Sequence, residues 1–164
     1  MSPQLDRLLQ RLEPASEGNL AVRLRFGLAC VQRVAHLLEQ PAALACLQAL
    51  EQAVECGATD DGLAALAARA DEMASRHPGS RSLDGVGHAA VSATYACAKA
   101  IAGRARQAAE YAAYAAVYGQ GGYGATSDPS SFDPEDEWQA AQLERLLLTT
   151  SFDGPPPCGS GEGR

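Results

Sequence analysis

The chain has 164 residues, a length that suits one domain and that can bury a core without disulfide bonds or metal ions. Its 13 basic and 20 acidic side chains give a net charge of -7, and no run of lysine or arginine follows the spacing of a phosphate backbone. We therefore expect no nucleic acid partner. The negative charge serves solubility, and it also suits association with a basic protein.

The five cysteines are scattered along the chain and form no C-x-x-C pair. They are Cys30, Cys46, Cys56, Cys97 and Cys158. The first four lie among Ala, Leu and Val, where we expect buried thiols, and the pattern predicts neither a disulfide framework nor a metal or cofactor site. No segment is apolar for long enough to span a membrane, and the amino terminus does not resemble a secretion signal. These features indicate a cytoplasmic protein with no membrane partner.

Capping residues and prolines delimit four helices in the first half of the chain. These predicted helices run from Pro3 to before Pro14, from about Leu20 to Glu39, from Pro41 to before Gly57, and from Thr59 to about His77. Their apolar residues recur with helical period, which is typical of helices that pack on one face.

The second half predicts a helix from about Val86 to Ala102, a possible break at Gly103, another helix to Tyr118, and a final helix opened by Asp133 and Pro134. Residues 119–133 are rich in Gly, Ser and Asp, so we expect a flexible loop there and a disordered tail over 153–164. No run of alternating β-branched residues occurs. The sequence therefore predicts an all-α, single-domain bundle of about six to seven helices over residues 1–152.

One acid and one histidine have the spacing of a helical pair, because Asp84 precedes His88 by four residues. A carboxylate that orients an imidazole is typical of a general base. In the other interpretation, Asp84 stabilises the start of a helix and His88 packs in the fold. Since no nucleophile accompanies the pair, we expect no catalytic residues and no enzymatic activity.

Four acids gather in "SFDPEDEWQ", and they are Asp133, Glu135, Asp136 and Glu137. Such a group can bind a hard cation, but acids are also expected in the first turn of a helix on dipole grounds. The glycine-rich "GQGGYG" lacks the lysine and the Ser or Thr of a phosphate loop. We therefore expect no small-molecule ligand.

Three tyrosines lie along one stripe of the alanine-rich "AAEYAAYAAVYG". They are Tyr111, Tyr114 and Tyr118, and either the core or a docking surface would accept them. Because the surrounding alanines supply little volume, we expect at least Tyr114 in the core. Tyr123, in the predicted loop, is expected to be an exposed contact.

The segment "RFGLACVQRVAHLLEQP" resembles the opening signature of a family of all-helical immunity proteins from bacterial polymorphic toxin systems, the fifth numbered immunity family. The residues in the signature positions are Phe26, Cys30, Arg33, Glu39 and Pro41. The resemblance continues through "ALEQAVECG" and "EDEWQAAQL" and spans residues 23–148. Ala29 and Val54 depart from it, because the family usually has an acid and a tryptophan at these positions.

The resemblance implies a cofactor-free helical protein that binds a cognate toxin and neutralises it by occlusion. The alternative is a non-catalytic helical adaptor or scaffold protein of another assembly. In either case we expect the partner to contact tyrosines and acids, namely Tyr111, Tyr118, Tyr123, Asp133, Glu135, Asp136 and Glu137.

Overall fold

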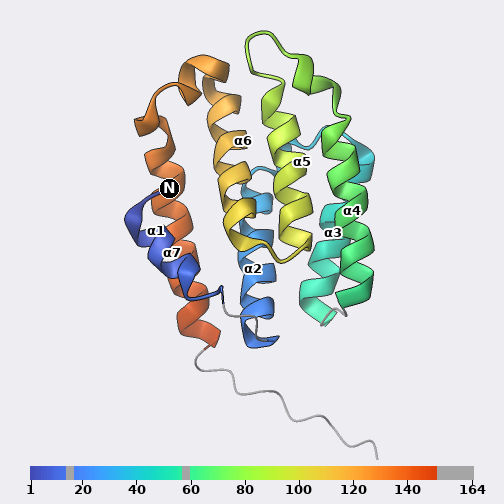
Figure 1. Cartoon of the computed structure of the whole chain (residues 1–164), viewed down its shortest axis with the longest axis vertical. Helices are drawn as coiled ribbons and strands as arrows, with labels where there is room; N and C mark the ends of the chain where they lie inside the picture. The colour runs from blue at the N-terminus through green and yellow to red at the C-terminus, as the bar shows by residue number, and fades with distance from the viewer. Residues whose placement is uncertain (14–16, 57–59, 151–164) are drawn as a thin grey trace, which may run out of the picture.

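The computed structural model describes residues 1–13, 17–56 and 60–150, which form α-helices and short 3₁₀ helices but no strand (Figure 1). The α-helices are α1 (Pro3–Gln10), α2 (Glu17–Arg33), α3 (Pro41–Cys56), α4 (Asp60–Ser75), α5 (His88–Ile101), α6 (Ala105–Thr126) and α7 (Asp133–Thr150). The 3₁₀ helices are η1 (Ala35–Leu37), η2 (Pro78–Arg81) and η3 (Pro129–Phe132). The predicted all-α bundle is confirmed.

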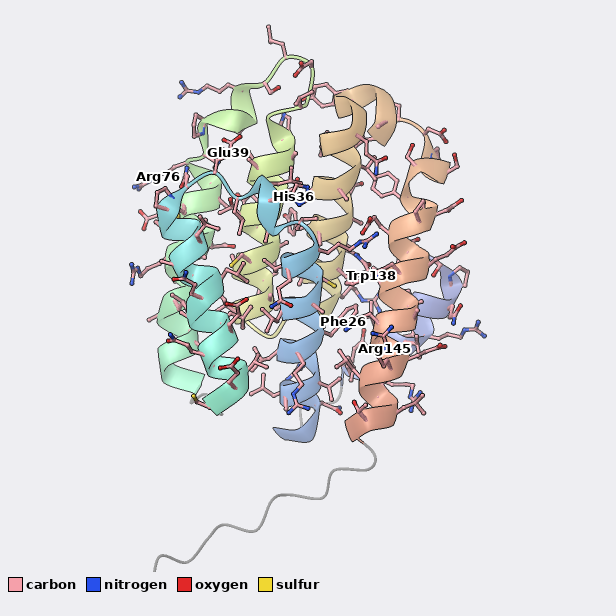
Figure 2. All side chains as sticks on the ribbon, turned by 180° about the vertical axis from the view of Figure 1, so that it is seen from behind. Phe26, His36, Glu39, Arg76, Trp138 and Arg145 are labelled. Carbon is pink, nitrogen blue, oxygen red and sulfur yellow. The ribbon has the colours of Figure 1, made fainter. Side chains whose placement is uncertain are left out.

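The α-helices are arranged in two layers (Figure 1). One layer contains α4, α5 and α6 side by side, and the other contains α3, α2 and α7, which lie nearest the viewer in Figure 2. The short α1 packs across α7 at one edge. Helix α5 contacts α2, α3, α4 and α6, so it is the central element of the bundle.

Small side chains let the neighbouring helices come close to α5. Ala93, Ala96 and Cys97 are completely buried within it. On the facing side of α2, a Cβ atom added to Gly27 would lie 2.8 Å from the Cβ of Ala100. The contact between α2 and α5 therefore depends on both positions remaining small.

Larger side chains fill the space between the layers beside this close contact. Phe26, Leu50, Ile101 and Leu143 come from four different helices and are almost fully buried. Ser2 begins the chain's first helix by accepting a hydrogen bond from Leu5 N, as its position before proline predicts. The buried apolar residues of the helices form one hydrophobic core.

The predicted second helix is too long at its carboxyl end, because α2 ends at Arg33 and not at Glu39. Val34 has a φ of -113° and a ψ of 12°, and the chain then forms η1 and becomes extended at Leu38. Val34 and Leu38 are both buried, so the turn continues the apolar pattern of the helix although its backbone is different. The helical period of the apolar residues alone could not distinguish a continued α-helix from this turn and 3₁₀ helix.

The predicted flexible loop over residues 119–133 is wrong. Most of this segment continues α6, which bends at Gly121 and Gly122 and runs on to Thr126, before η3 follows. Gly122 has a φ of +57°, and a Cβ atom there would collide with the carbonyl oxygen of Asp84. Glycine is therefore needed at the bend, since it allows both this conformation and the close approach of the two backbones.

The remaining helix boundaries lie within a few residues of the predicted ones or outside the described residues. Gly103 has a φ of +64° and separates α5 from α6, which confirms the predicted break. Helix α4 ends at Ser75, two residues before the predicted end. The predictions for Gly57 and for the tail over 153–164 fall outside the described part of the chain.

The described helices include none that is long and apolar enough to cross a membrane. Over the same residues there is no group of three or more side chains that could hold a metal ion. Cys30, Cys46 and Cys97 are buried as expected, whereas Cys56 is exposed at the end of α3, so the prediction of a buried thiol at Cys56 is wrong. The helix end carries this side chain out of the apolar interface.

The close contact between α2 and α5 predicts that Gly27→Ala lowers the free energy of unfolding by about 1–3 kcal/mol, because the new methyl group overpacks the interface. Gly62, in α4, has open space around its Cα. Gly62→Ala should therefore raise the free energy of unfolding by up to about 1 kcal/mol. Urea denaturation measures both effects, and equal stabilisation by the two substitutions would contradict the tight contact.

The cysteine environments predict selective labelling. Burial raises the pKa of the Cys97 thiol to about 12 and also raises the pKa values of Cys30 and Cys46, so their reactive thiolates are scarce at neutral pH. With a thiol reagent under native conditions, Cys56→Ser should remove one rapidly reacting equivalent and Cys97→Ala should remove none. Rapid native labelling of Cys97 would contradict its burial.

Candidate functional site

One end of the bundle carries a continuous row of aromatic rings, which we call the aromatic row. Its members are His88 of α5, Tyr114, Tyr118 and Tyr123 of α6, and Phe132 of η3. Neighbouring ring centroids lie 5.0 Å to 6.0 Å apart, at distances typical of stacked and edge-to-face pairs. The rings thereby join three elements of the fold.

The outer rings of this row face away from the core. Tyr114 and Tyr123 are each 45% exposed. The prediction that Tyr114 is buried in the core is therefore wrong, because alanines such as Ala112 and Ala115 occupy the buried face of α6. The narrow interface that these alanines create leaves no space for a tyrosine ring.

The predicted tyrosine stripe divides into two parts. Tyr111 is half-buried and stacks on Tyr95 of α5, with ring centroids 5.0 Å apart, so it stands apart from the aromatic row. Tyr118 is also half-buried, between Tyr114 and Tyr123. Of the tyrosines expected to contact a partner, only Tyr123 presents a large part of its ring to solvent.

Tyr123 is held in place by the connection between α4 and α5. Its backbone N–H donates to the carbonyl oxygen of Asp84 at 2.9 Å, and its hydroxyl lies 2.9 Å from Nε2 of His88. The carboxylate of Asp84 accepts hydrogen bonds from Ser82 Oγ and Val86 N, which lower its pKa. Asp84 therefore stabilises a turn, and its carboxylate does not form the predicted pair with His88.

The same turn displays an apolar side chain at the tip of the bundle. Leu83 is 98% exposed. Gly85 has a φ of +82° and packs so closely on Tyr123 that an added Cβ atom would lie 2.9 Å from the ring. Figure 1 shows the turn and the bent end of α6 at the same end of the molecule. Leu83 thus lies on a backbone that several hydrogen bonds hold, beside the aromatic row.

A cleft of about 770 Å³ adjoins the aromatic row and lies between α6, η3 and α7. Tyr114 and Phe132 line it together with the acids Glu110, Asp133 and Asp136. Glu110 and Asp133 are exposed, so their charges face the solvent at the mouth of the cleft. Aromatic rings beside carboxylates suit cationic side chains such as lysine and arginine. We refer to Leu83, the aromatic row and this cleft together as the tip surface.

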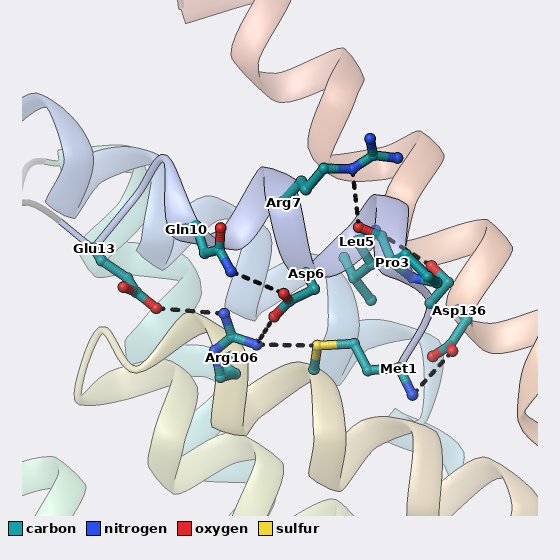
Figure 3. Close-up of polar contacts among 10 residues, drawn as sticks. Met1, Pro3, Leu5, Asp6, Arg7, Gln10, Glu13, Arg106 and Asp136 are labelled. Atoms are coloured by element: carbon teal, nitrogen blue, oxygen red, sulfur yellow. Dashed lines mark hydrogen bonds and ion pairs between the residues drawn. The ribbon is translucent and has the colours of Figure 1, made fainter.

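The four acids of α7 separate into two exposed and two buried residues. Asp133 and Glu137 are exposed. Glu135 is buried and binds Arg33 of α2 through two hydrogen bonds, of 2.7 Å and 2.9 Å. Asp136 is also buried and lies 3.1 Å from the amino group of Met1 (Figure 3). A partner could bind these two acids only by breaking ion pairs of the fold.

The pair of Arg33 and Glu135 belongs to a larger set of contacts between α2 and α7. The guanidinium of Arg33 lies over the ring of Trp138, 4.6 Å from its centroid, and hydrogen bonding to Glu135 raises the pKa of Arg33. Figure 2 shows Phe26 and Trp138 at the boundary of the two helices. Arg33 lies in one sequence motif, and Glu135 and Trp138 lie in another, "SFDPEDEWQ"; their pairing could not be predicted, because Arg33 is distant in the sequence from the other two.

A second ionic cluster holds α1 against α6. Figure 3 shows Arg106 of α6 between the carboxylates of Asp6 and Glu13. Gln10 also donates to Asp6, one turn along α1. No feature of the sequence had singled out Arg106.

The different positions of the α7 acids predict different effects on stability. Glu135→Gln should lower the free energy of unfolding by about 1–3 kcal/mol, because it weakens a charge-assisted pair inside the fold. Glu137→Gln, at an exposed position of the same helix, should change it by less than about 0.5 kcal/mol. Chemical denaturation tests both variants, and similar losses would show that the contact with Arg33 contributes little.

The chain matches no protein-family model, and the comparisons with curated proteins and with solved structures give no match. The resemblance to the immunity family therefore remains a prediction from motif residues. The candidate site itself rests on the geometry of the tip surface.

Proposed function

We propose that this chain is a non-catalytic immunity-type protein that binds a cognate bacterial toxin and neutralises it by covering the toxin's active site. The observation that carries the proposal is the tip surface, where Leu83, Tyr114 and Tyr123 are exposed beside carboxylates. The resemblance of the motif residues suggests a toxin as the class of partner.

The apolar part of the tip surface supplies suitable anchors. Large side chains that a partner buries contribute most of the affinity of protein interfaces, and tyrosines are enriched among them. Tyr114 and Tyr123 pack against other rings, so they lose little side-chain freedom on binding. Leu83 projects from a turn that Asp84 holds, and it offers almost its whole side chain to a partner pocket.

The charges of the tip surface favour a basic partner. Glu110 and Asp133 are exposed at the mouth of the cleft, Glu137 is exposed further along α7, and the whole chain has a net charge of -7. Complementary charge raises the association rate, and salt screens this effect. A toxin that acts on nucleic acid would present a basic surface of the kind that these acids attract.

The chemistry of the described residues supports a binding role over a catalytic one. His88, the histidine at the tip surface, has its Nε2 beside the Tyr123 hydroxyl, while the Asp84 carboxylate is engaged by Ser82 and Val86. A general base needs a ring nitrogen within reach of the proton that it removes, and a carboxylate often orients the ring, but no carboxylate contact of His88 is found among the described residues. A helical adaptor of another assembly would use the same surface, and the activity of the captured partner distinguishes the two.

The test begins with affinity capture of the partner from native cells, followed by binding measurements with purified proteins. Leu83→Ser should weaken binding about tenfold or more, because it removes an exposed anchor without disturbing the core. Leu44→Ser is the matched control, since Leu44 is 41% exposed on α3, away from the tip surface. Asp133→Lys should lower the association rate, and more strongly at low salt.

Occlusion also requires a fixed stoichiometry. If the captured partner is a toxin, protection should end once the toxin exceeds this protein in molar amount. Protection that continues against a large excess of toxin would mean that each molecule of this protein inactivates many toxin molecules. That result would contradict occlusion and indicate an enzyme. A partner without toxic activity would favour the adaptor, and equal binding by the Leu83 and Leu44 variants would remove the tip surface as the site.

A further inference from the structure

We propose that the cleft between α6, η3 and α7 is a pocket for the guanidinium group of a single arginine, which the protein partner supplies. One side chain is thereby assigned to one cavity of about 770 Å³, whereas the proposed function needs only a basic partner. The source of the arginine rests on the proposed function. The binding of a guanidinium group depends on this chain alone.

A buried amide with a free oxygen is the first observation that points to a ligand. Gln139 of α7 borders the cleft and is only 1% exposed. Its Nε2 donates to the carbonyl oxygen of Ala109 at 2.9 Å, while its Oε1 accepts no hydrogen bond from the described part of the chain. Unlike Nε2 of His77, which is sealed inside the fold without a partner, Oε1 keeps contact with open space. Since buried acceptors are nearly always paired, this oxygen is available to a donor that enters the cleft.

Asp136 adds a second acceptor one turn earlier on the same helix. It is 8% exposed and also lines the cleft. Its Oδ2 lies 3.1 Å from the amino group of Met1 (Figure 3), whereas Oδ1 has no partner among the described residues. Residues three apart share a helix face, so the side chains of Asp136 and Gln139 lie on the same side of α7. The carboxylate thus holds one positive group already and has an oxygen left for another donor.

The charges around the cleft favour a cation. Glu110 and Asp133 are exposed at its mouth, and neither forms an ion pair within residues 1–13, 17–56 and 60–150. The described lining includes no lysine or arginine, and Arg106, one turn before Glu110, is bound by Asp6 and Glu13 instead. Three lining carboxylates therefore face one amino group. The positive end of the α7 dipole, equivalent to about half a charge, does not outweigh them.

The aromatic wall favours a guanidinium group over an ammonium group. Tyr114 and Phe132 line the cleft with ring centroids 5.0 Å apart, and Tyr114 is 45% exposed. A planar guanidinium stacks on such a ring and is more weakly hydrated than an ammonium, so it enters a partly buried cleft at a lower desolvation cost. Its five N–H donors also suit acceptors that come from two helices, whereas an ammonium has three donors on one atom.

The pocket is tested by NMR on the full chain with two probes of equal charge, N-acetyl-arginine amide and N-acetyl-lysine amide. The side-chain amide of Gln139 is the reporter. We expect saturable shifts with the arginine probe and a dissociation constant about threefold or more higher for the lysine probe. Shifts that increase linearly, or an unmoved Gln139 resonance, would overturn the pocket. Equal binding of both probes would overturn the assignment to guanidinium.

Substitutions at exposed positions test the two walls without disturbing the core. Glu110→Gln combined with Asp133→Asn should raise the dissociation constant of the arginine probe about fivefold or more, whereas Glu137→Gln, outside the cleft lining, should not change it. Tyr114→Leu should raise it about threefold. Tyr123→Leu is the matched control, since Tyr123 is equally exposed but does not line the cleft. Equal effects of the cleft variants and their controls would contradict the site.

The captured partner separates this proposal from the proposed function. The Glu110 and Asp133 double variant should weaken partner binding about fivefold or more. Unchanged partner binding by this variant, although it has lost the arginine probe, would overturn a partner arginine as the ligand. If Leu83→Ser leaves partner binding unchanged while the arginine probe still saturates the cleft, the proposed partner surface fails and the guanidinium pocket is supported.

Discussion

The close approach of α2 to α5, at Gly27 and Ala100, is the constraint on which the remaining arrangement depends. A central helix can contact four neighbours only if its side chains are short, and α5 meets this condition with alanine at most of its buried positions. The same rule applies to the buried face of α6, where Ala108, Ala112 and Ala115 occupy the interface. Bulky residues are consequently displaced to the edges of these interfaces, and the aromatic row forms at one such edge.

The attachment of α7 follows a different principle, because polar groups contribute to its contacts with the rest of the bundle. Glu135 binds Arg33 beneath a cation–π contact with Trp138, and Gln139 donates to the backbone oxygen of Ala109. Buried polar groups of this kind need partners in defined directions, so they determine how α7 is placed on α2 and α6. They also explain why a cluster of neighbouring acids in the sequence contains both structural and exposed members.

The two ends of the bundle differ in charge and chemistry. The tip surface combines exposed rings with carboxylates, whereas a cavity at the opposite end is lined by Arg23, Arg104 and Arg106 beside one described acid, Glu13. The bend at Gly122 shapes the tip surface, because it directs Tyr123 onto the turn of Asp84 and joins two connections into one surface.

The sequence by itself determined the features that depend on neighbouring residues. Ser2 as a cap, Pro41 and Asp133 as helix starts, and Gly103 as a break all follow from local backbone preferences, and together with the apolar period they predict the all-α class. Only the tertiary structure decided the exposure of Tyr114, the burial of Glu135 and the helical state of the glycine-rich segment. Each of these depends on a group that is distant in the sequence: the alanine-lined face of α5, the guanidinium of Arg33, and the carbonyl oxygen of Asp84. Local propensity carries no information about such partners, because their contacts exist only once the helices have packed.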